Sequence, residues 1–473
     1  MKAVGLFTGI SEGHMARDVT DSTPISSRDE LVGWLEAGCK GDAPLKLGTE
    51  HEKFPYYADA LTPVPYEGRD GRGGIGAILQ GVRETTGWAP IEDAGNLIGL
   101  FDESAGGAIS LEPGGQFELS GAPLDNVHET ETELAAHLDL VNRVAAQHGV
   151  RFTSLGMNPL WTLAETPRMP KSRYRIMTAY MPKVGTRGLD MMYRTCTVQV
   201  NLDYRSEADM VRKLRASIAL QPITTALFAN SPFTEGKPNG LLSARSEIWR
   251  DTDNQRAGMT PFVFEDGFGF EQYVDWVLRV PMYFVKRGET YHDVAGADFR
   301  DLLAGKLAAL PGEKATMSDW ANHVSTIFPE VRLKRYLEMR GADSGSAPHI
   351  LALPALFVGL LYDDAALSAA WDLVKGWGAE ERQQLRDDVP RLGLDARIAG
   401  RSARDVARDA LAISRDGLKR RARLDAQGRD ETRHLDILDE RVARGRTEAQ
   451  NLLDLYDGAW GKSVRPAFEH CRI

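Results

Sequence analysis

Four segments, far apart in the chain, each place two polar side chains on one face of a predicted β-strand. The four pairs are Glu50 with Glu52, Gln116 with Glu118, Gln199 with Asn201, and Glu338 with Arg340. Residues two apart in a strand project from the same face, and the residues between them project from the other. Side by side in an antiparallel sheet, these strands would line a concave surface with oxygen atoms. The pattern favours a sheet with one oxygen-rich face and one apolar face.

The clearest of these strands spans residues 193–203, where polar and apolar residues alternate. Its apolar face consists of Cys196, Val198, Val200 and Leu202. The same alternation predicts strands over 45–54, 108–112, 116–120 and 333–341. Pro113, Gly114 and Gly115 form a short turn between the second and third of these. In the 333–341 segment Arg335 shares a face with leucines, so that face is mixed.

Apolar residues at helical spacing predict helices around the sheet. The first two predicted helices span 28–37 and 125–148, and Gly149 is the C-cap of the second. A third helix begins at a capping box formed by Ser206 and Asp209 and runs to about 229. The most apolar run, 350–362, contains Pro354 and is short for a membrane span, so we expect a buried helix. From about 364 to 456 the pattern is helical. No linker divides the chain, which predicts a single catalytic domain over 1–473 with a helical C-terminal part from about 364.

A glycine-rich run at 71–76 precedes a predicted helix over 77–85. Backbone N–H groups at such a helix start can hold a phosphate group. The run lacks the Lys and Ser/Thr of a P-loop, so a turn that initiates the helix is the favoured interpretation.

Charge and cysteine content limit the class of partner. The net charge of -10 argues against nonspecific nucleic-acid binding and favours small-molecule partners. Residues 1–11 lack a basic segment followed by an apolar run, which argues against a secretory signal. Three scattered cysteines without metal-type spacing fit a reducing cytoplasm. We therefore predict a cytoplasmic protein that binds neither nucleic acid nor membrane, with an oligomeric state that the sequence leaves open.

The paired carboxylates could bind a metal ion or could simply be a solvated strand face. Clustered hard oxygen donors without a Cys or His cluster favour Mg²⁺ over zinc, and Mg²⁺ commonly accompanies a nucleotide phosphate. An acid and base pair for glycoside hydrolysis is the alternative, but so many carboxylates and amides on shared faces argue against it. Arg245 and Arg250 could each hold the carboxylate of an amino-acid substrate or lie on the surface, and solvent is the default for Lys237.

Longer segments around these strands resemble a known family. They are GTEHEKF at 48–54, LEPGGQFELSGAPL at 111–124, the run from MPKSRYR to TVQVNLD at 169–203, ALFANSPFTEGKPNG at 226–240 and IFPEVRLKRYLEMRGAD at 327–343. The chain resembles the glutamate-cysteine ligases of the plant and proteobacterial type, within the carboxylate-amine ligases of the glutamine-synthetase-like superfamily. The likeness extends over nearly the whole chain.

The resemblance implies an α+β fold in which a curved antiparallel sheet, a saddle or half-barrel, is surrounded by helices. It also implies an ATP-dependent reaction between L-glutamate and L-cysteine. The γ-carboxylate of glutamate would attack the γ-phosphorus of ATP, and the amine of cysteine would displace phosphate from the γ-glutamyl phosphate. The product, γ-glutamylcysteine, is the first intermediate of glutathione or a related thiol. Alternatives are a ligase with another amine acceptor and a catalytically silent binding homologue.

By the family pattern, the residues of this chain that resemble Mg²⁺ ligands are Glu50, Glu52, Glu118, Gln199 and Glu338. Arg340 resembles a phosphate partner, and it and Glu52 are the predicted catalytic residues. The residues that resemble substrate contacts are Arg173 and Arg245 for glutamate, and Asn201 and Tyr283 for cysteine. Plant members carry two regulatory disulfides, whose positions correspond here to Glu131 with Leu351 and Val294 with Ala309. We therefore expect no such redox switch.

Overall fold

A ten-stranded sheet, with every strand pair antiparallel, forms the centre of the protein in a computed structural model that describes residues 21–473. The predicted lack of a signal in residues 1–11 lies outside the described residues. The main path runs β15-β16-β8-β1-β6-β5-β4-β3, and β2 and β7 also pair with β1. The strands are β1 (Leu47–Tyr57), β2 (Thr62–Pro63), β3 (Ala89–Asp93), β4 (Asn96–Phe101), β5 (Ala108–Leu111), β6 (Phe117–Ser120), β7 (Val150–Thr153), β8 (Thr197–Leu202), β15 (Val331–Leu333) and β16 (Leu337–Asp343).

Strand β1 organises this sheet because it pairs with four others. Its first part lies between β8 and β6, and its last four residues pair with β7, with β2 also bound to the end. The change of partners at Phe54 lets one long strand belong to two parts of a twisted sheet. The strand therefore extends three residues beyond the predicted 45–54.

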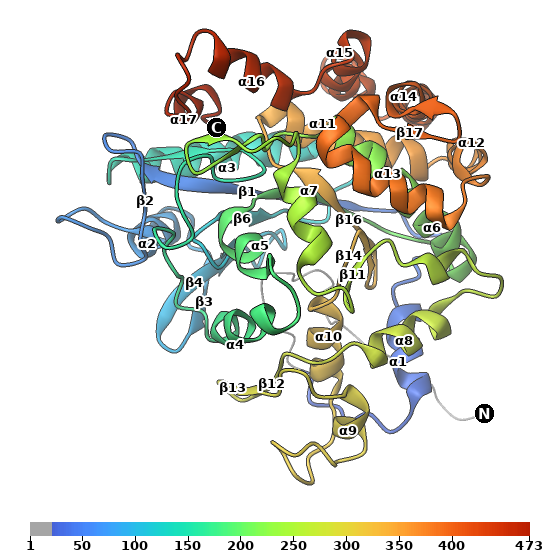
Figure 1. Cartoon of the computed structure of the whole chain (residues 1–473). Helices are drawn as coiled ribbons and strands as arrows, with labels where there is room; N and C mark the ends of the chain where they lie inside the picture. Colours follow the sequence, from blue (N-terminus) through green and yellow to red (C-terminus); the bar gives the residue numbers. More distant parts are fainter. Residues whose placement is uncertain (1–20) are drawn as a thin grey trace.

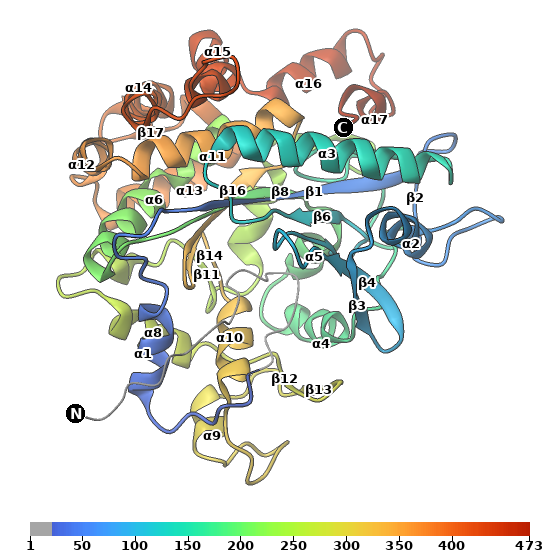
Figure 2. The same cartoon turned by 180° about the vertical axis from the view of Figure 1, so that it is seen from behind.

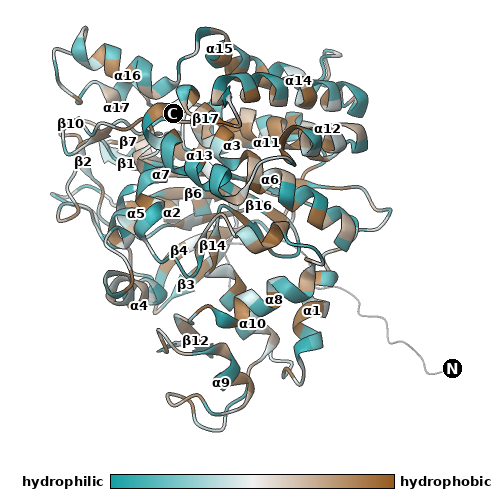
Figure 3. Cartoon of the chain, turned by 45° about the vertical axis from the view of Figure 1, so that its right-hand side comes forward, coloured by the Kyte–Doolittle hydropathy of each residue, from teal (hydrophilic) through white to brown (hydrophobic). Residues whose placement is uncertain are grey.

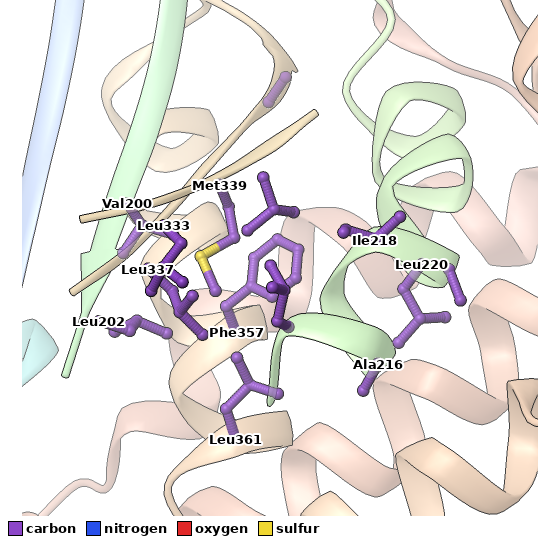
Figure 4. Close-up of a cluster of buried hydrophobic side chains, with 14 of the residues drawn as sticks. Val200, Leu202, Ala216, Ile218, Leu220, Leu333, Leu337, Met339, Phe357 and Leu361 are labelled. Atoms are coloured by element: carbon purple, nitrogen blue, oxygen red, sulfur yellow. The ribbon is translucent and has the colours of Figure 1, made fainter. Parts of the chain in front are cut away.

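A layer of helices covers the apolar face of the sheet (Figures 1 and 2). These helices are α2 (Ile75–Thr86), α3 (Val127–Ala146), α6 (Glu207–Leu227), α11 (Ala347–Leu361), α12 (Asp364–Val374), α13 (Ala379–Leu392), α14 (Ala403–Arg421) and α15 (Asp436–Arg444). The last helices are α16 (Glu448–Asp457) and α17 (Ala467–His470), and Phe468 of α17 packs against Phe54 and Tyr56 of β1. Val200, Leu202 and Met339 point from the sheet toward Phe357 and Leu361 of α11, with Ile218 of α6 beyond them (Figure 4). Full burial of such side chains contributes about 1.5–3 kcal/mol each.

The other side of the sheet carries shorter elements (Figures 1 and 2). They include α1 (Arg28–Glu36), α4 (Ser172–Tyr180), α5 (Gly188–Arg194), α7 (Ala244–Ile248), α8 (Phe270–Arg279), α9 (Phe299–Leu303) and α10 (Met317–Ser325). Four small strand pairs join them: β9 (Phe233–Thr234) with β10 (Lys237–Pro238), β11 (Ala257–Gly258) with β14 (Phe328–Pro329), β12 (Phe284–Arg287) with β13 (Thr290–Asp293), and β17 (Arg397–Ile398) with β18 (Arg401–Ser402) in the C-terminal part.

The predicted fold class is confirmed, including the helical C-terminal region. In Figure 3, α14 and α16 each carry both hydrophilic and hydrophobic residues, as expected for helices with one buried face. The apolar run at 350–362 is the buried helix α11, as predicted. Among the described residues no single helix is long and apolar enough to cross a membrane, although α11 and α12, bent by 95° at their junction, pass that test as a pair. The single catalytic domain stays a prediction.

Two predicted strands are wrong in part. The segment 333–341 is the end of β15, a tight turn through Lys334, Arg335 and Tyr336, and then β16. Alternation continued through the turn residues by chance, so the spacing alone did not show the reversal. In the segment 193–203, Tyr193 and Arg194 end α5, and β8 begins at Thr197.

Candidate active site

The polar face of the sheet brings the predicted carboxylates together. Glu52 on β1 lies directly opposite Glu118 on β6, and Glu50 lies opposite Gln199 on β8. Glu338 on β16 lies opposite Asn201. Four of the predicted metal ligands are less than 10% exposed: Glu50, Glu118, Gln199 and Glu338. Residues from four strands thus form one buried cluster, in the arrangement that the period of two predicted.

Neutral groups hold three of these carboxylates. Glu50 accepts hydrogen bonds from Asn201 Nδ2 at 2.8 Å and Gln199 Nε2 at 3.3 Å. Glu118 accepts from the hydroxyls of Ser110 and Ser120 at 2.9 and 3.2 Å. The backbone N–H of Thr197 donates to Glu52 at 3.0 Å. These donors orient the carboxylates without cancelling their charge.

The acid-base properties of the cluster reflect this crowding. Burial, followed by the charges of Glu338 and Glu118, raises the pKa of Glu50 well above its usual range. Burial, followed by Glu112 and Glu118, does the same to the pKa of Glu52. Carboxylates in this setting favour a cation that shares their charge. Glu50 is 4% exposed, which excludes the solvated strand face for this residue, whereas Glu52 is partly exposed.

Glu338 differs from the others because two arginines surround it. Burial alone would raise its pKa, but the charges of Arg332 and Arg340 outweigh burial and lower the pKa to about 2. Arg332 Nη2 donates to both carboxylate oxygens, at 2.7 and 2.8 Å, and Arg340 Nη1 also contacts Glu338. Arg332 was not among the residues predicted from the sequence. It lies directly across the hairpin from Glu338, but the prediction of one continuous strand over 333–341 concealed that hairpin.

A β-bulge in β16 places Arg340 beside the cluster. The register of β16 against β8 shifts between Met339 and Ala342. Two buried side chains of α6 bind the backbone of Gly341 there: Gln221 accepts from its N–H at 3.1 Å, and Thr225 donates to its carbonyl at 2.9 Å. A Cβ atom on Gly341 would lie 2.3 Å from Gln221 Oε1, so a larger residue would displace the side chain that binds the bulge. Bulges of this kind redirect side chains next to active sites, and the Arg340 guanidinium reaches Gln199 and Glu338.

Glu112 is a further acidic residue that sequence analysis did not select. It follows β5 at the turn before Gln116, and Gly115, with a φ of +86°, allows that turn. Burial, followed by the charge of Glu118, raises the pKa of Glu112 to about 7, while Lys171 and Arg173 act in the opposite direction. The Tyr174 hydroxyl donates to Glu112 at 3.0 Å. The predicted Arg173 therefore lies near this end of the cluster.

The other predicted substrate residues lie at different distances from the cluster. Asn201 is within it, through its hydrogen bond to Glu50. Arg245 on α7 is 3% exposed and donates to the backbone carbonyl of Arg340 at 2.7 Å. A small pocket adjoins Arg245 and Arg340 and is lined also by Trp249 and Phe328. Tyr283 packs instead against Arg256 and Tyr180, with its hydroxyl near Met181, and no contact joins it to the carboxylates.

Several other sequence hypotheses are resolved by the contacts. Gln116 is structural, since its side chain binds the backbone of Gly114, Met192 and Thr195. The glycine-rich run begins α2, and the N–H groups of Ile75 and Gly76 already donate to the backbone carbonyls of residues 65 and 66. A turn that initiates the helix is thus the correct interpretation. Lys237 is exposed, and Arg250 pairs with Glu247 and Asp387.

Comparison with known proteins identifies the family. The model of glutamate-cysteine ligase family 2 matches residues 46–470. The chain belongs to glutamate-cysteine ligase family 2. A chloroplastic glutamate-cysteine ligase from Nicotiana tabacum is 53% identical over 451 residues, which cover 95% of this chain and 84% of the relative. The enzyme of the same name from Arabidopsis thaliana is 53% identical over 448 residues, 95% of this chain and 83% of the relative.

A solved structure supports the fold. The glutamate-cysteine ligase of Francisella tularensis in complex with AMP matches with a TM-score of 0.53 over 88% of this chain and 86% of that one, at 10% identity. At that identity the likeness concerns the fold alone. The family prediction is confirmed, and with it the ATP-dependent glutamate-cysteine ligase activity that the family carries.

The prediction of a cytoplasmic location is wrong. The relatives that cover 95% of this chain are named as chloroplastic enzymes. Few and scattered cysteines indicate only a compartment that keeps thiols reduced, and a cytoplasm is not the only one.

We expect the activity of this ligase to be insensitive to mild thiol reductants. Cys39, Cys196 and Cys471, which are all the cysteines of the chain, are free. At the positions of the plant disulfides, Glu131 instead forms an ion pair with Arg433, and Leu351 is buried in the core. The test compares ADP release after preincubation with and without reductant, with substrate cysteine kept reduced in both assays. A large, reversible loss of turnover on reduction would contradict the prediction.

Proposed function

We propose that the polar face of the sheet catalyses the ligation of glutamate to cysteine through a γ-glutamyl phosphate. The observation that supports this site most is the cluster of buried carboxylates next to Arg340, Arg332 and Arg245. In the proposed reaction the γ-carboxylate of glutamate attacks the γ-phosphorus of ATP, and ADP leaves. The amine of cysteine then attacks the acyl carbon, phosphate leaves, and the amine loses a proton. Catalysis of such a transfer depends on positioning and charge neutralisation.

We infer that Glu50, Glu52 and Glu118 hold Mg²⁺, together with Gln199 and Glu338. The donor set fits this ion, because it consists of carboxylate and amide oxygens. The raised pKa values of Glu50 and Glu52 also fit, since these buried carboxylates have only neutral hydrogen-bond donors. Glu112 is a further candidate ligand. When bound, Mg²⁺ would neutralise charge on the phosphates of ATP.

The arginines have separate proposed roles. Arg340, which faces the cluster from the bulge, is suited to contact the transferred phosphate. Arg332 keeps Glu338 ionised and in place. Arg245 and Arg173 are suited to hold the carboxylates of glutamate, because a guanidinium can bind a carboxylate with two parallel hydrogen bonds. Asn201 and Tyr283 remain proposed cysteine contacts, and for Tyr283 this requires the substrate to reach the aromatic cluster around Tyr180.

A substrate panel tests the proposed function. ADP release is measured with glutamate and a series of amines, with cysteine among them and each amine omitted in turn as the blank. We expect cysteine to give the highest kcat/KM. A strong preference for another amine would assign the chain to a different acceptor. Absence of ADP release with every amine would favour a silent binding homologue.

A further inference from the structure

Two histidines and a glutamate form a cluster between α3 and the C-terminal helical region. His128 and Glu131 lie three residues apart on α3, and therefore on one face of it. His434 lies in the short 3-10 segment that precedes α15. One ligand atom from each of the three residues lies within 4.8 Å of the other two. Both histidines are buried, and Glu131 is partly exposed.

The orientation of His128 is that of a metal ligand. Its Nε2 donates to the backbone carbonyl of Arg423 at 3.3 Å, so Nδ1 is the unprotonated nitrogen, and its lone pair faces Arg433 and His434. Metal-binding histidines are usually fixed in this way by their second nitrogen. His128 Nδ1 faces His434 Nε2 at a separation of 3.5 Å. Two nitrogen ligands at tetrahedral Zn²⁺, each about 2.1 Å from the ion, lie about 3.4 Å apart.

Arg433 supplies the positive charge of this cluster in the structure. Its Nη2 forms an ion pair with Glu131 and lies 3.4 Å from His128 Nδ1. The side chain is 25% exposed, and its Nε already lies 3.6 Å from Asp425. The guanidinium thus has a second acidic partner if a metal ion takes its place beside Glu131.

We propose that His128, Glu131 and His434 bind a divalent transition metal ion of the zinc type, with water as a fourth ligand. Two imidazole nitrogens and one carboxylate oxygen select Zn²⁺ or Co²⁺ over Mg²⁺. Arg433 competes with the ion for Glu131. The site is separate from the carboxylate cluster, because α3 covers the opposite face of the sheet, where its His137 lies 2.7 Å from Lys53 of β1. The bound ion would join α3 to the segment before α15.

The test uses the full-length protein after treatment with a chelator, with Mg²⁺ in excess to occupy the carboxylate cluster. Co²⁺ is titrated while the visible absorption bands of four-coordinate Co²⁺ are recorded, and Zn²⁺ is then added as a competitor. We expect one equivalent of Co²⁺ to bind to the wild type and to be displaced by Zn²⁺. H434Q and H128Q should weaken binding by about a hundredfold. R433M should strengthen it severalfold, because it removes the competing cation.

The matched control is H470Q, since His470 is 44% exposed and lies on α17 beside Glu448. This variant should bind Co²⁺ as the wild type does. Zn²⁺ should also raise the midpoint of thermal unfolding of the wild type and not of H434Q, and circular dichroism verifies that each variant is folded. Unchanged Co²⁺ binding in both H434Q and H128Q would overturn the proposal. So would absence of binding in both the wild type and R433M at micromolar Co²⁺.

Discussion

Replacing Glu52 by Gln is expected to lower kcat by about a hundredfold to a thousandfold, the range seen when one preorganised charge-stabilising group is lost. Glu52 is the proposed metal ligand whose cross-strand neighbour is a second carboxylate, Glu118. The amide retains an oxygen for the N–H of Thr197, so the local hydrogen bond survives. What the variant loses is negative charge at the centre of the cluster, which weakens its hold on a cation.

The same change should leave the free energy of unfolding unchanged or higher. Burial and the charges of Glu112 and Glu118 oppose ionisation of Glu52, so its removal relieves repulsion in the protein without nucleotide. The measurements are ADP release over a range of Mg²⁺ concentrations and urea unfolding. The matched control is Glu92→Gln, an exposed glutamate of β3 in the same sheet. Turnover equal to that of the wild type would refute the proposed role of Glu52.

Replacing Arg332 by Met is expected to destabilise the protein by about 3–5 kcal/mol, because a buried carboxylate then loses its main partner. Glu338 is fully buried, and Arg332 binds both of its oxygens. Arg332 also donates to the backbone carbonyls of Ser325 and Ile327, which would lose a donor. Urea unfolding in the absence of nucleotide measures the effect. The matched control, Arg143→Met, removes an exposed helix pair with Asp139 and should cost less than about 1 kcal/mol.

A double variant separates the charge from the packing. If the unpaired carboxylate causes most of the loss, Arg332→Met combined with Glu338→Gln should recover more than half of it. The recovered protein should still be inactive, since Glu338 is a proposed ligand. A single variant as stable as the wild type would show that Arg340 alone compensates the charge of Glu338, and the assigned role of Arg332 would fail.

Much of this site could be predicted because the spacing in a strand is rigid. Glu50 and Glu52 must share a face once residues 47–57 are extended, and the same holds for Gln199 and Asn201. The family resemblance then supplied the reaction. The local sequence does not show which strands pair with each other, because the alternation of polar and apolar residues along a strand is compatible with any neighbouring strand. Gln116 shows this, since it lies just before β6 and its side chain binds the backbone of Gly114 and Thr195.

By itself, the sequence determined which side chains belong to the oxygen-rich face, which helices are buried, and which family the chain joins. Only the tertiary structure decided the charge balance of the site. Arg332 lies opposite Glu338 because the chain reverses between Lys334 and Tyr336, and Arg340 reaches the cluster because α6 holds a bulge at Gly341. The position of Arg340 depends on contacts between residues that are distant in the chain. The position of Arg332 depends on a turn that the alternation of polar and apolar residues conceals. The electrostatics of a buried cluster depend on three-dimensional distances, which local periodicity does not contain.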